Sequence, residues 1–213
     1  MSAAVTIIDY GVGNLFSVRS AITKCGAEVI VSDDGEQIEK ADRLLLPGVG
    51  AFAPSMNDMR RHNLIEPLEN FLKQGRPLLG ICLGMQMLFD VSEEFGLHDG
   101  LGLIPGRVFS IPSQQHDGSS LRIPHVGWEE ISSPPGRDWG GTLMDGIALQ
   151  SSFYFAHSFR AVPEHEEHLI ASCMYGGHDI PAVVGNENIH GCQFHPEKSG
   201  SVGLKIISNF LAL

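Results

Sequence analysis

The stretch PLLGIC (77–82) is a continuous apolar run, and a helical pattern, LGMQMLFDVSEE (83–94), follows it directly. Such a run predicts a strand that is buried on both faces of a sheet. Three earlier segments have the same character: VTIIDY (5–10), AEVIVS (27–32) and RLLLPG (43–48). Helical patterns at 14–24 and 54–74 lie between these strands. The alternation predicts an α/β fold, with an open, mostly parallel sheet flanked by helices.

The second half of the chain, after about residue 105, is richer in strand-like segments joined by turns that contain Pro and Gly. These segments are GRVFSI (106–111), HVGWEEIS (125–132), SFYFAHSF (152–159), HLIASCMY (168–175), PAVVGN (181–186) and IHGCQFH (189–195). A helical pattern at 201–213 closes the chain, and the stretches 112–120 and 132–141 predict surface loops. We therefore expect a single domain over residues 1–213 with a β-rich second half.

Composition narrows the possible functions. The 213 residues carry 14 Lys and Arg against 25 Asp and Glu, a formal charge of −11, which argues against nonspecific binding to nucleic acid or to an anionic membrane. No apolar run approaches the roughly 18 residues that span a bilayer. The N-terminal segment has no basic region and reaches Asp9 early, which argues against a signal peptide. The cysteines lack CxxC spacing, which favours free thiols and a cytoplasmic protein.

The first chemical signal is GICLG (80–84), at the predicted junction of strand and helix. This is the nucleophile-elbow pattern with Cys82 in the position of the nucleophile. The tight turn needs small residues two before and two after it, and the helix N-terminus favours a thiolate. The amide of Leu83 is placed to hold an oxyanion. The alternative is a buried core cysteine between two packing glycines.

The second signal is GCQFHPE (191–197), in which His195 ends an apolar strand and Glu197 follows two residues later. A nucleophilic cysteine needs a base, and the base needs a group that orients it. Pro196 keeps the preceding residue extended, so Glu197 is a candidate to accept from the far nitrogen of the imidazole. The alternative is an exposed loop histidine beside a surface acid.

A glycine-rich turn, LPGVG (46–50), follows another predicted strand. The amides of Val49 and Gly50 are candidates for a second oxyanion donor, and the alternative is an ordinary strand-ending turn. The segment PEHEEH (163–168) predicts an exposed turn rather than a metal site, and we expect neither a metal nor a cofactor.

Together these motifs resemble the class I (triad-type) glutamine amidotransferase family over residues 5 to about 200. Some segments are most similar to the branch of the family that provides the glutaminase subunit of imidazole glycerol phosphate synthase. They are DYGVGN (9–14), LPGVGAF (46–52), GICLGMQMLF (80–89), PHVGWEE (124–130), YFAHSF (154–159) and GCQFHPEKSG (191–200).

The resemblance implies that a Cys82 thiolate attacks the carboxamide of L-glutamine, that His195 transfers the protons, and that Glu197 orients His195. It implies an oxyanion hole of Leu83 with Val49 or Gly50. Our hypothesis is that a flip of the Gly48–Val49 peptide gates this hole, since glycine tolerates such a change. It further implies a set of residues that bind the amino-acid end of glutamine: Gln86, Glu94, His157, Ser158 and Phe159.

One glutaminase-sized domain accounts for all 213 residues, which leaves none to form a synthase that uses the ammonia. We therefore expect a separate subunit that consumes it. The resemblance implies a heterodimer with a (β/α)8-barrel cyclase of histidine biosynthesis and little glutaminase activity until that partner is loaded. Asn14, Tyr154 and Lys198 are candidates for the interface, although Lys198 is equally explained as a solvated lysine.

Three alternatives remain open at this point. The first is another cysteine hydrolase on the same elbow. The second is a glutaminase that serves a different synthase, such as that of anthranilate, aminodeoxychorismate or pyridoxal phosphate. The third is a module that binds and regulates a partner without catalysis.

Overall fold

The computed structural model describes residues 4–213 and contains a nine-stranded mixed sheet with the order β2-β1-β3-β4-β13-β12-β11-β8-β9. Residues 1–3, the start of the segment in which we saw no export signal, lie outside the described part. Five neighbouring strands pair in parallel: β2 (Glu28–Ser32), β1 (Ala4–Ile8), β3 (Leu44–Leu46), β4 (Leu78–Ile81) and β13 (Ile189–Cys192). The parallel part follows the pattern expected from the apolar runs.

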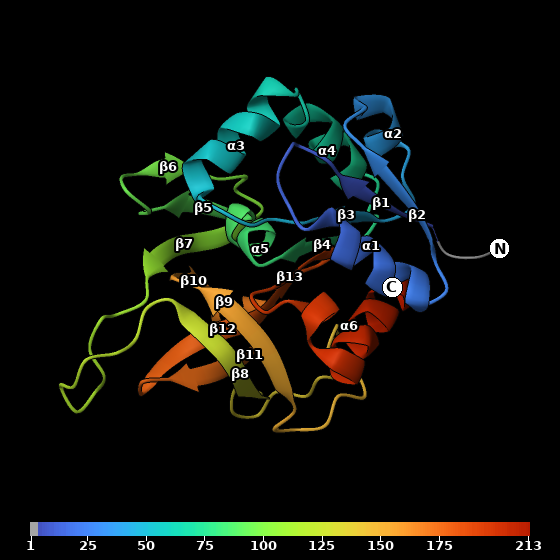
Figure 1. The fold of residues 1–213 in the computed structure, drawn as a ribbon. Coiled ribbons are helices and arrows are strands. Elements are labelled where there is room, and N and C mark those ends of the chain that lie inside the picture. Colours follow the sequence, from blue (N-terminus) through green and yellow to red (C-terminus); the bar gives the residue numbers. More distant parts are fainter. Residues whose placement is uncertain (1–3) are drawn as a thin grey trace.

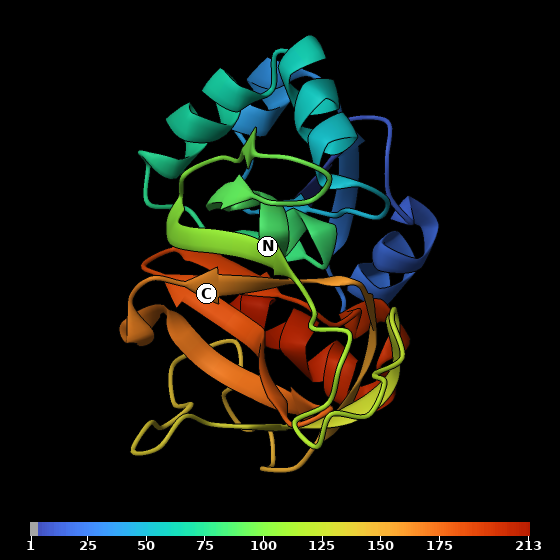
Figure 2. The ribbon, with the colours of Figure 1, turned by 90° about the vertical axis from the view of Figure 1, so that its left-hand side faces the viewer.

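The other half of the sheet is antiparallel. It consists of β12 (His178–Asn186), β11 (Leu169–Tyr175), β8 (His125–Ser132) and β9 (Ser152–His157). A smaller sheet has the order β10 (Phe159–Pro163), β7 (Ile104–Ser110), β5 (Phe89–Ser92) and β6 (His98–Asp99). Figure 2 shows the antiparallel strands β11 and β12 of the large sheet at the end of the molecule opposite α3 and α4, whereas β6 of the smaller sheet lies beside α3 (Figure 1). The β-rich second half is confirmed.

Helices cover both faces of the parallel strands (Figure 1). One core cluster joins the strands to α1 (Leu15–Lys24) and α6 (Gly200–Ala212). The other joins them to α2 (Gly35–Glu39), α3 (Phe52–Arg61) and α4 (Ile65–Leu72). The α/β fold is confirmed. Within residues 4–213, no helix has the length and apolar character needed to cross a membrane.

Two helix predictions need correction. The pattern over 83–94 is not one helix, because α5 (Leu83–Met87) ends early and β5 follows it, with Phe89 paired to Ile104 of β7. The pattern over 54–74 is split into α3 and α4 at Asn63, whose φ of 55° lies in the left-handed region. Asparagine tolerates that conformation better than most residues, and it ends the first helix there.

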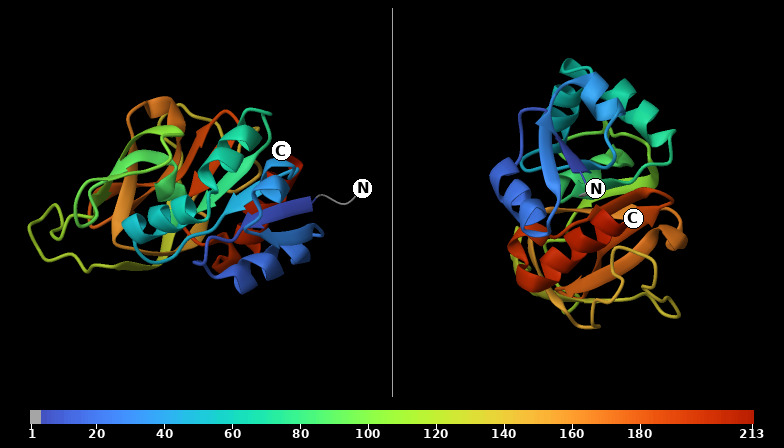
Figure 3. Two further views of the ribbon diagram at one scale, coloured as in Figure 1. Left: turned by 90° about the horizontal axis from the view of Figure 1, so that it is seen from above. Right: turned by 90° about the vertical axis from the view of Figure 1, so that its right-hand side faces the viewer.

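The predicted surface loops differ from one another. Segment 112–120 is mostly exposed and projects from the body (Figure 3). Segment 132–141 is anchored, because Trp139 is buried and its indole Nε1 donates to Ile170 O at 2.9 Å. The PEHEEH segment forms a short 3-10 helix, Glu166–His168, with no fully buried residue.

Candidate functional site

Cys82 lies in the sharp turn between β4 and α5. Its φ is 55° and its ψ is −108°, a conformation that is strained for a residue with a Cβ. The amide of Cys82 donates to Cys192 O at 2.8 Å, so β13 holds the turn from the side. Strain at a single cysteine on a strand-to-helix turn is the geometry of a nucleophile elbow.

The glycines around Cys82 are required by close backbone contacts. A Cβ at Gly84 would lie 1.9 Å from Leu46 O, and a Cβ at Gly80 would lie 2.7 Å from Gly84 O. A Cβ at Gly48 would lie 2.6 Å from the amide nitrogen of Gly84. The turn after β3 therefore packs directly on the start of α5, which brings the Val49–Gly50 segment beside the elbow.

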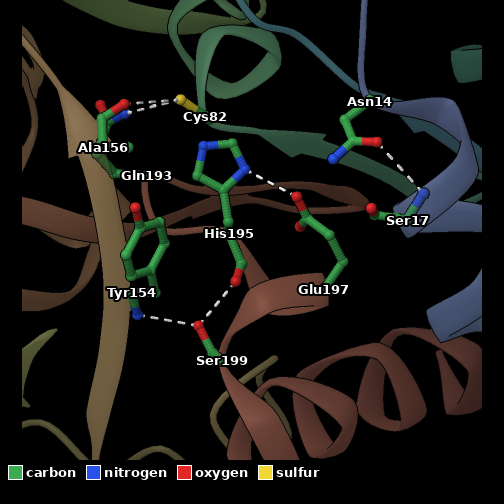
Figure 4. A network of polar contacts seen from close by, with 9 residues as sticks. All are labelled: Asn14, Ser17, Cys82, Tyr154, Ala156, Gln193, His195, Glu197 and Ser199. Carbon is green, nitrogen blue, oxygen red and sulfur yellow. Dashed lines mark hydrogen bonds and ion pairs between the residues drawn. The ribbon is translucent and has the colours of Figure 1, made fainter. Parts of the chain in front are cut away.

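His195 reaches the same edge of the sheet from the neighbouring strand. Ile81 at the end of β4 pairs with Cys192 at the end of β13 in parallel register, so both chains leave the sheet side by side. The amide of His195 donates to Tyr154 O at 2.9 Å. Ser199 Oγ donates to His195 O at 2.7 Å and accepts from the Tyr154 amide at 3.0 Å (Figure 4). Strand β9 thus fixes the backbone that carries the imidazole.

Glu197 completes a triad. It lies in a 3-10 turn, Pro196–Lys198, and its Oε1 accepts from His195 Nδ1 at 2.8 Å, with both side chains almost fully buried. Burial alone would lower the pKa of His195. Hydrogen bonds to Cys82 and Glu197, together with their charges, outweigh burial and raise the pKa to about 9. A protonated imidazole that faces Cys82 stabilises negative charge on the sulfur.

A cavity of about 590 Å³ opens over this triad. Its volume lies in the range of small-molecule sites. Cys82 and His195 lie in its wall. It is also lined by every residue that we predicted for the oxyanion hole and for glutamine: Val49, Gly50, Leu83, Gln86, Glu94, His157, Ser158 and Phe159. The structure therefore brings residues from five separate segments to one cavity, although their roles there remain predictions.

Hydrogen bonds hold the cavity wall in place. Phe159 O accepts from Gln86 Nε2 at 2.9 Å and lies 2.7 Å from His157 Nδ1, which donates to it. Burial lowers the pKa of His157 to about 3, so its ring is neutral at ordinary pH. Glu94 Oε2 accepts from the amide of Phe52 at 2.6 Å, at the start of α3.

Two of the predicted interface residues, Asn14 and Tyr154, lie around the triad (Figure 4), and the third, Lys198, follows Glu197 in the chain. Lys198 is exposed, and its Nζ lies 5.7 Å from the centre of the Tyr154 ring. Asn14 is half-buried and its Oδ1 accepts from the Ser17 amide at 3.4 Å, as the cap of α1. The sequence analysis did not identify Trp128 as an interface candidate. Trp128 lies on β8, pairs with Tyr154 of β9 and is 54% exposed. The period-two alternation of β8 could have indicated it.

Two buried polar side chains were also missed. Gln193 contacts Cys82, and His125 Nδ1 lies 3.0 Å from His157 Nε2 on the neighbouring strand. No sequence pattern marks either contact. All four cysteines are free, and among residues 4–213 no cluster of His, Cys, Asp or Glu could hold a metal ion.

Comparisons with known proteins agree with this geometry. The family model for glutamine amidotransferase class-I matches residues 6–213. The chain is 51% identical to imidazole glycerol phosphate synthase subunit HisH 1 of Legionella pneumophila (strain Lens), over 99% of this chain and 100% of that protein. It is 44% identical to subunit HisH of Geobacillus thermodenitrificans, over 98% of this chain and 95% of that one.

Solved structures support the fold. The structure of PurLQS from Thermotoga maritima superposes with a TM-score of 0.72 at 19% identity, over 100% of this chain and 99% of that one. A chain described as glutamine amidotransferase gives a TM-score of 0.70 at 18% identity, over 98% and 99% of the two chains. The family model and the full-length relatives show that the chain belongs to the class I glutamine amidotransferase family and, within it, to the HisH group.

Proposed function

We propose that this chain, acting as one domain, is the glutaminase subunit of an imidazole glycerol phosphate synthase and hydrolyses L-glutamine to glutamate and ammonia. The observation that carries the proposal is the triad itself. A strained Cys82 and a His195 with its pKa raised to about 9 line one cavity, and a buried Glu197 holds the imidazole at 2.8 Å. The names of the HisH relatives favour this synthase over the others that we considered.

The residues divide the reaction between them. The Cys82 thiolate attacks the carboxamide carbon of glutamine, and the oxygen gains negative charge in front of the Leu83 amide and the Val49–Gly50 segment. His195 gives its proton to the leaving nitrogen, so ammonia departs and a thioester remains. The neutral imidazole then takes a proton from water, which attacks the thioester and releases glutamate and the thiolate.

Glu197 acts through His195. Its Oε1 lies 2.8 Å from Nδ1, which directs Nε2 of the ring toward the sulfur and the leaving group. Glu197 Oε2 is buried without a hydrogen-bond partner among residues 4–213, so the imidazolium is the main compensation for the carboxylate charge. The pair therefore favours the charged state of His195 from which the reaction starts.

The ammonia passes to a partner subunit in this proposal, a (β/α)8-barrel cyclase in the cytoplasm. A surface beside the cavity suits such a partner: Val126, Trp128 and Lys198 are exposed there, and Tyr154 on β9 is half-buried opposite Trp128. Exposed aromatic side chains with a charged rim are typical of protein interfaces. Asn14 lies at the edge of the same region, near Glu197 (Figure 4).

The test is glutamate release from glutamine by the chain alone and with the cyclase subunit plus its nucleotide ligand. We expect a large increase in the complex and a loss of at least about 10⁴-fold in Cys82→Ala. Full activity without the cyclase would retain the glutaminase and reject the assignment to this synthase. Unchanged partner-dependent activity in Cys82→Ala would support a noncatalytic module instead.

A further inference from the structure

Gln193 lies between the nucleophile and the wall of the glutamine cavity. It follows β13 directly, and its amide nitrogen in the backbone donates to Ala182 O at 2.9 Å. Its side chain is fully buried. Nε2 lies 3.7 Å from Cys82 Sγ, and Oε1 lies 2.9 Å from Gln86 Nε2. Nothing in the triad mechanism uses this side chain.

The direction of these hydrogen bonds follows from one backbone carbonyl. Phe159 O is only an acceptor, and it lies 2.9 Å from the Gln86 side-chain nitrogen. The second hydrogen of that nitrogen points at Gln193, which must present its oxygen there. The Gln193 amide nitrogen is then left to face the sulfur, where it is a donor in every protonation state of the site.

We propose that Gln193 is a further catalytic residue, which donates a hydrogen bond to the Cys82 thiolate in an orientation that Gln86 imposes. The inference rests on the proposed role of Cys82 as nucleophile. The neutral thiol has a different partner, because Ala156 O lies 4.0 Å from Sγ and accepts from S–H. The closer amide donor favours the thiolate over the thiol.

This donor differs from His195 in one respect. The imidazole loses its proton when ammonia leaves, whereas the Gln193 amide keeps its N–H through the whole cycle. When hydrolysis releases the sulfur, it regains negative charge in front of a donor that is already in place. Gln86 lines the cavity, so the same hydrogen bonds link the occupied wall to the nucleophile.

The decisive experiment measures the rate at which iodoacetamide alkylates Cys82 in the full chain, without glutamine or a partner, from pH 5 to 9.5. Methionine in Gln193→Met fills the same space without a donor. We expect Cys82 in this variant to be alkylated about tenfold more slowly than in the unsubstituted chain at the acid end of the range, and the midpoint of the rate profile to lie about one pH unit higher. Peptide mass spectrometry separates Cys82 from Cys25, which does not contact Gln193 and serves as the internal control. An unchanged profile in the folded variant would overturn the proposal.

A second variant tests the imposed orientation. Gln86→Met removes the group that fixes the Gln193 amide. The midpoint of its alkylation profile should therefore also move to higher pH, but by less than in Gln193→Met. A Gln86→Met profile identical to that of the unsubstituted chain would remove the role that we give to Gln86.

One measurement needs no substitution at Gln193. In ¹H–¹⁵N spectra of the unsubstituted protein, the assigned Gln193 side-chain amide should exchange slowly with solvent and shift when Cys82 is alkylated. No shift would contradict the contact. A chain that shows the Gln193-dependent alkylation profile but never releases glutamate would refute the proposed function and the catalytic role of Gln193, and would leave only its hydrogen bond to the thiolate intact.

Discussion

The parallel and antiparallel halves of the large sheet contribute different things to the site. The parallel half supplies the nucleophile, and its backbone is so close-packed that Gly84 has no room for a Cβ. The antiparallel half supplies His157 of the cavity wall and an exposed apolar surface that includes Trp128, and β10 of the smaller sheet continues the wall with Phe159. Close packing fixes where the sulfur lies, whereas hydrogen bonds and surface side chains determine what can bind next to it.

The largest expected effect concerns packing in the parallel half. Gly84→Ala puts a Cβ 1.9 Å from Leu46 O, so β3 and α5 must separate, and we expect a loss of about 3 kcal/mol in unfolding free energy. The control is Gly127→Ala in the antiparallel half, where no atom lies within 4 Å of the new Cβ. Urea unfolding measures both, and equal stability of the two variants would invalidate the contrast between the halves.

The next effect concerns Glu197, which follows β13, the strand at which the parallel and antiparallel halves of the sheet meet. Glu197→Gln removes a charge that raises the pKa of His195, so we expect about a 100-fold loss of glutaminase rate. Because the pKa of His195 is raised to about 9, the alkaline limb of the activity profile should lie near that pH and move to lower pH in the variant.

Glu197→Gln should also change how the unfolding free energy depends on pH. A raised pKa in the folded state stabilises the protein fully below the ordinary histidine value near 6.5, and this stabilisation is lost as pH rises through about 9. Unfolding experiments at pH 6 and pH 9.5 should therefore show a smaller difference for Glu197→Gln than for the unsubstituted chain. A larger difference would contradict the ion pair.

The third effect concerns the surface of the antiparallel half. Trp128→Ala should weaken binding of the cyclase subunit by about 2 kcal/mol, roughly 30-fold in Kd, with little change in the stability of the isolated chain. Leu149→Ala is the control, because Leu149 is 68% exposed but lies in the loop before β9, outside the proposed interface. Calorimetric titration distinguishes them, and equal Kd values would place the interface elsewhere.

The smallest effect concerns the wall of the cavity. His125→Phe keeps a ring against Tyr175 and Phe155 but removes the Nδ1 donor to His157, so we expect KM for glutamine to rise by about tenfold with kcat nearly unchanged. His125→Asn retains an N–H near the position of Nδ1 and should restore KM. A fall in kcat alone would show that the histidine pair does not act through the wall.

Local sequence signals were sufficient for most of the fold. Continuous apolar runs predicted β1 to β4, and the change of texture predicted the strands after residue 105. The error at 83–94 has a physical cause, because Phe89 and Val91 pair with β7 and this tertiary pairing overrides the helical period. The strand order, with β13 inserted between β4 and β12, depends on contacts distant in sequence.

The candidate site likewise contains some residues that local sequence patterns predict and others that they do not. Cys82, His195 and Glu197 lie in two short motifs that predict their chemistry when the motifs are taken together. Gln193 and His125 carry no such signal, because each acts on a residue of another strand or turn, brought near only by folding. Nearness in space to Cys82, rather than any local pattern, is what distinguishes Gln193 from the other glutamines.

The position of β13 has a consequence for the synthesis of the protein. The elbow that carries Cys82 is translated before its base, because residues 83–194 must follow before His195 exists. Strand β13 then has to insert between β4 and β12, both already made, before His195 meets the sulfur. A nascent chain therefore carries a thiol without its activating base until residue 195 has been made, and hydrolysis of glutamine begins only when both halves of the sheet are joined.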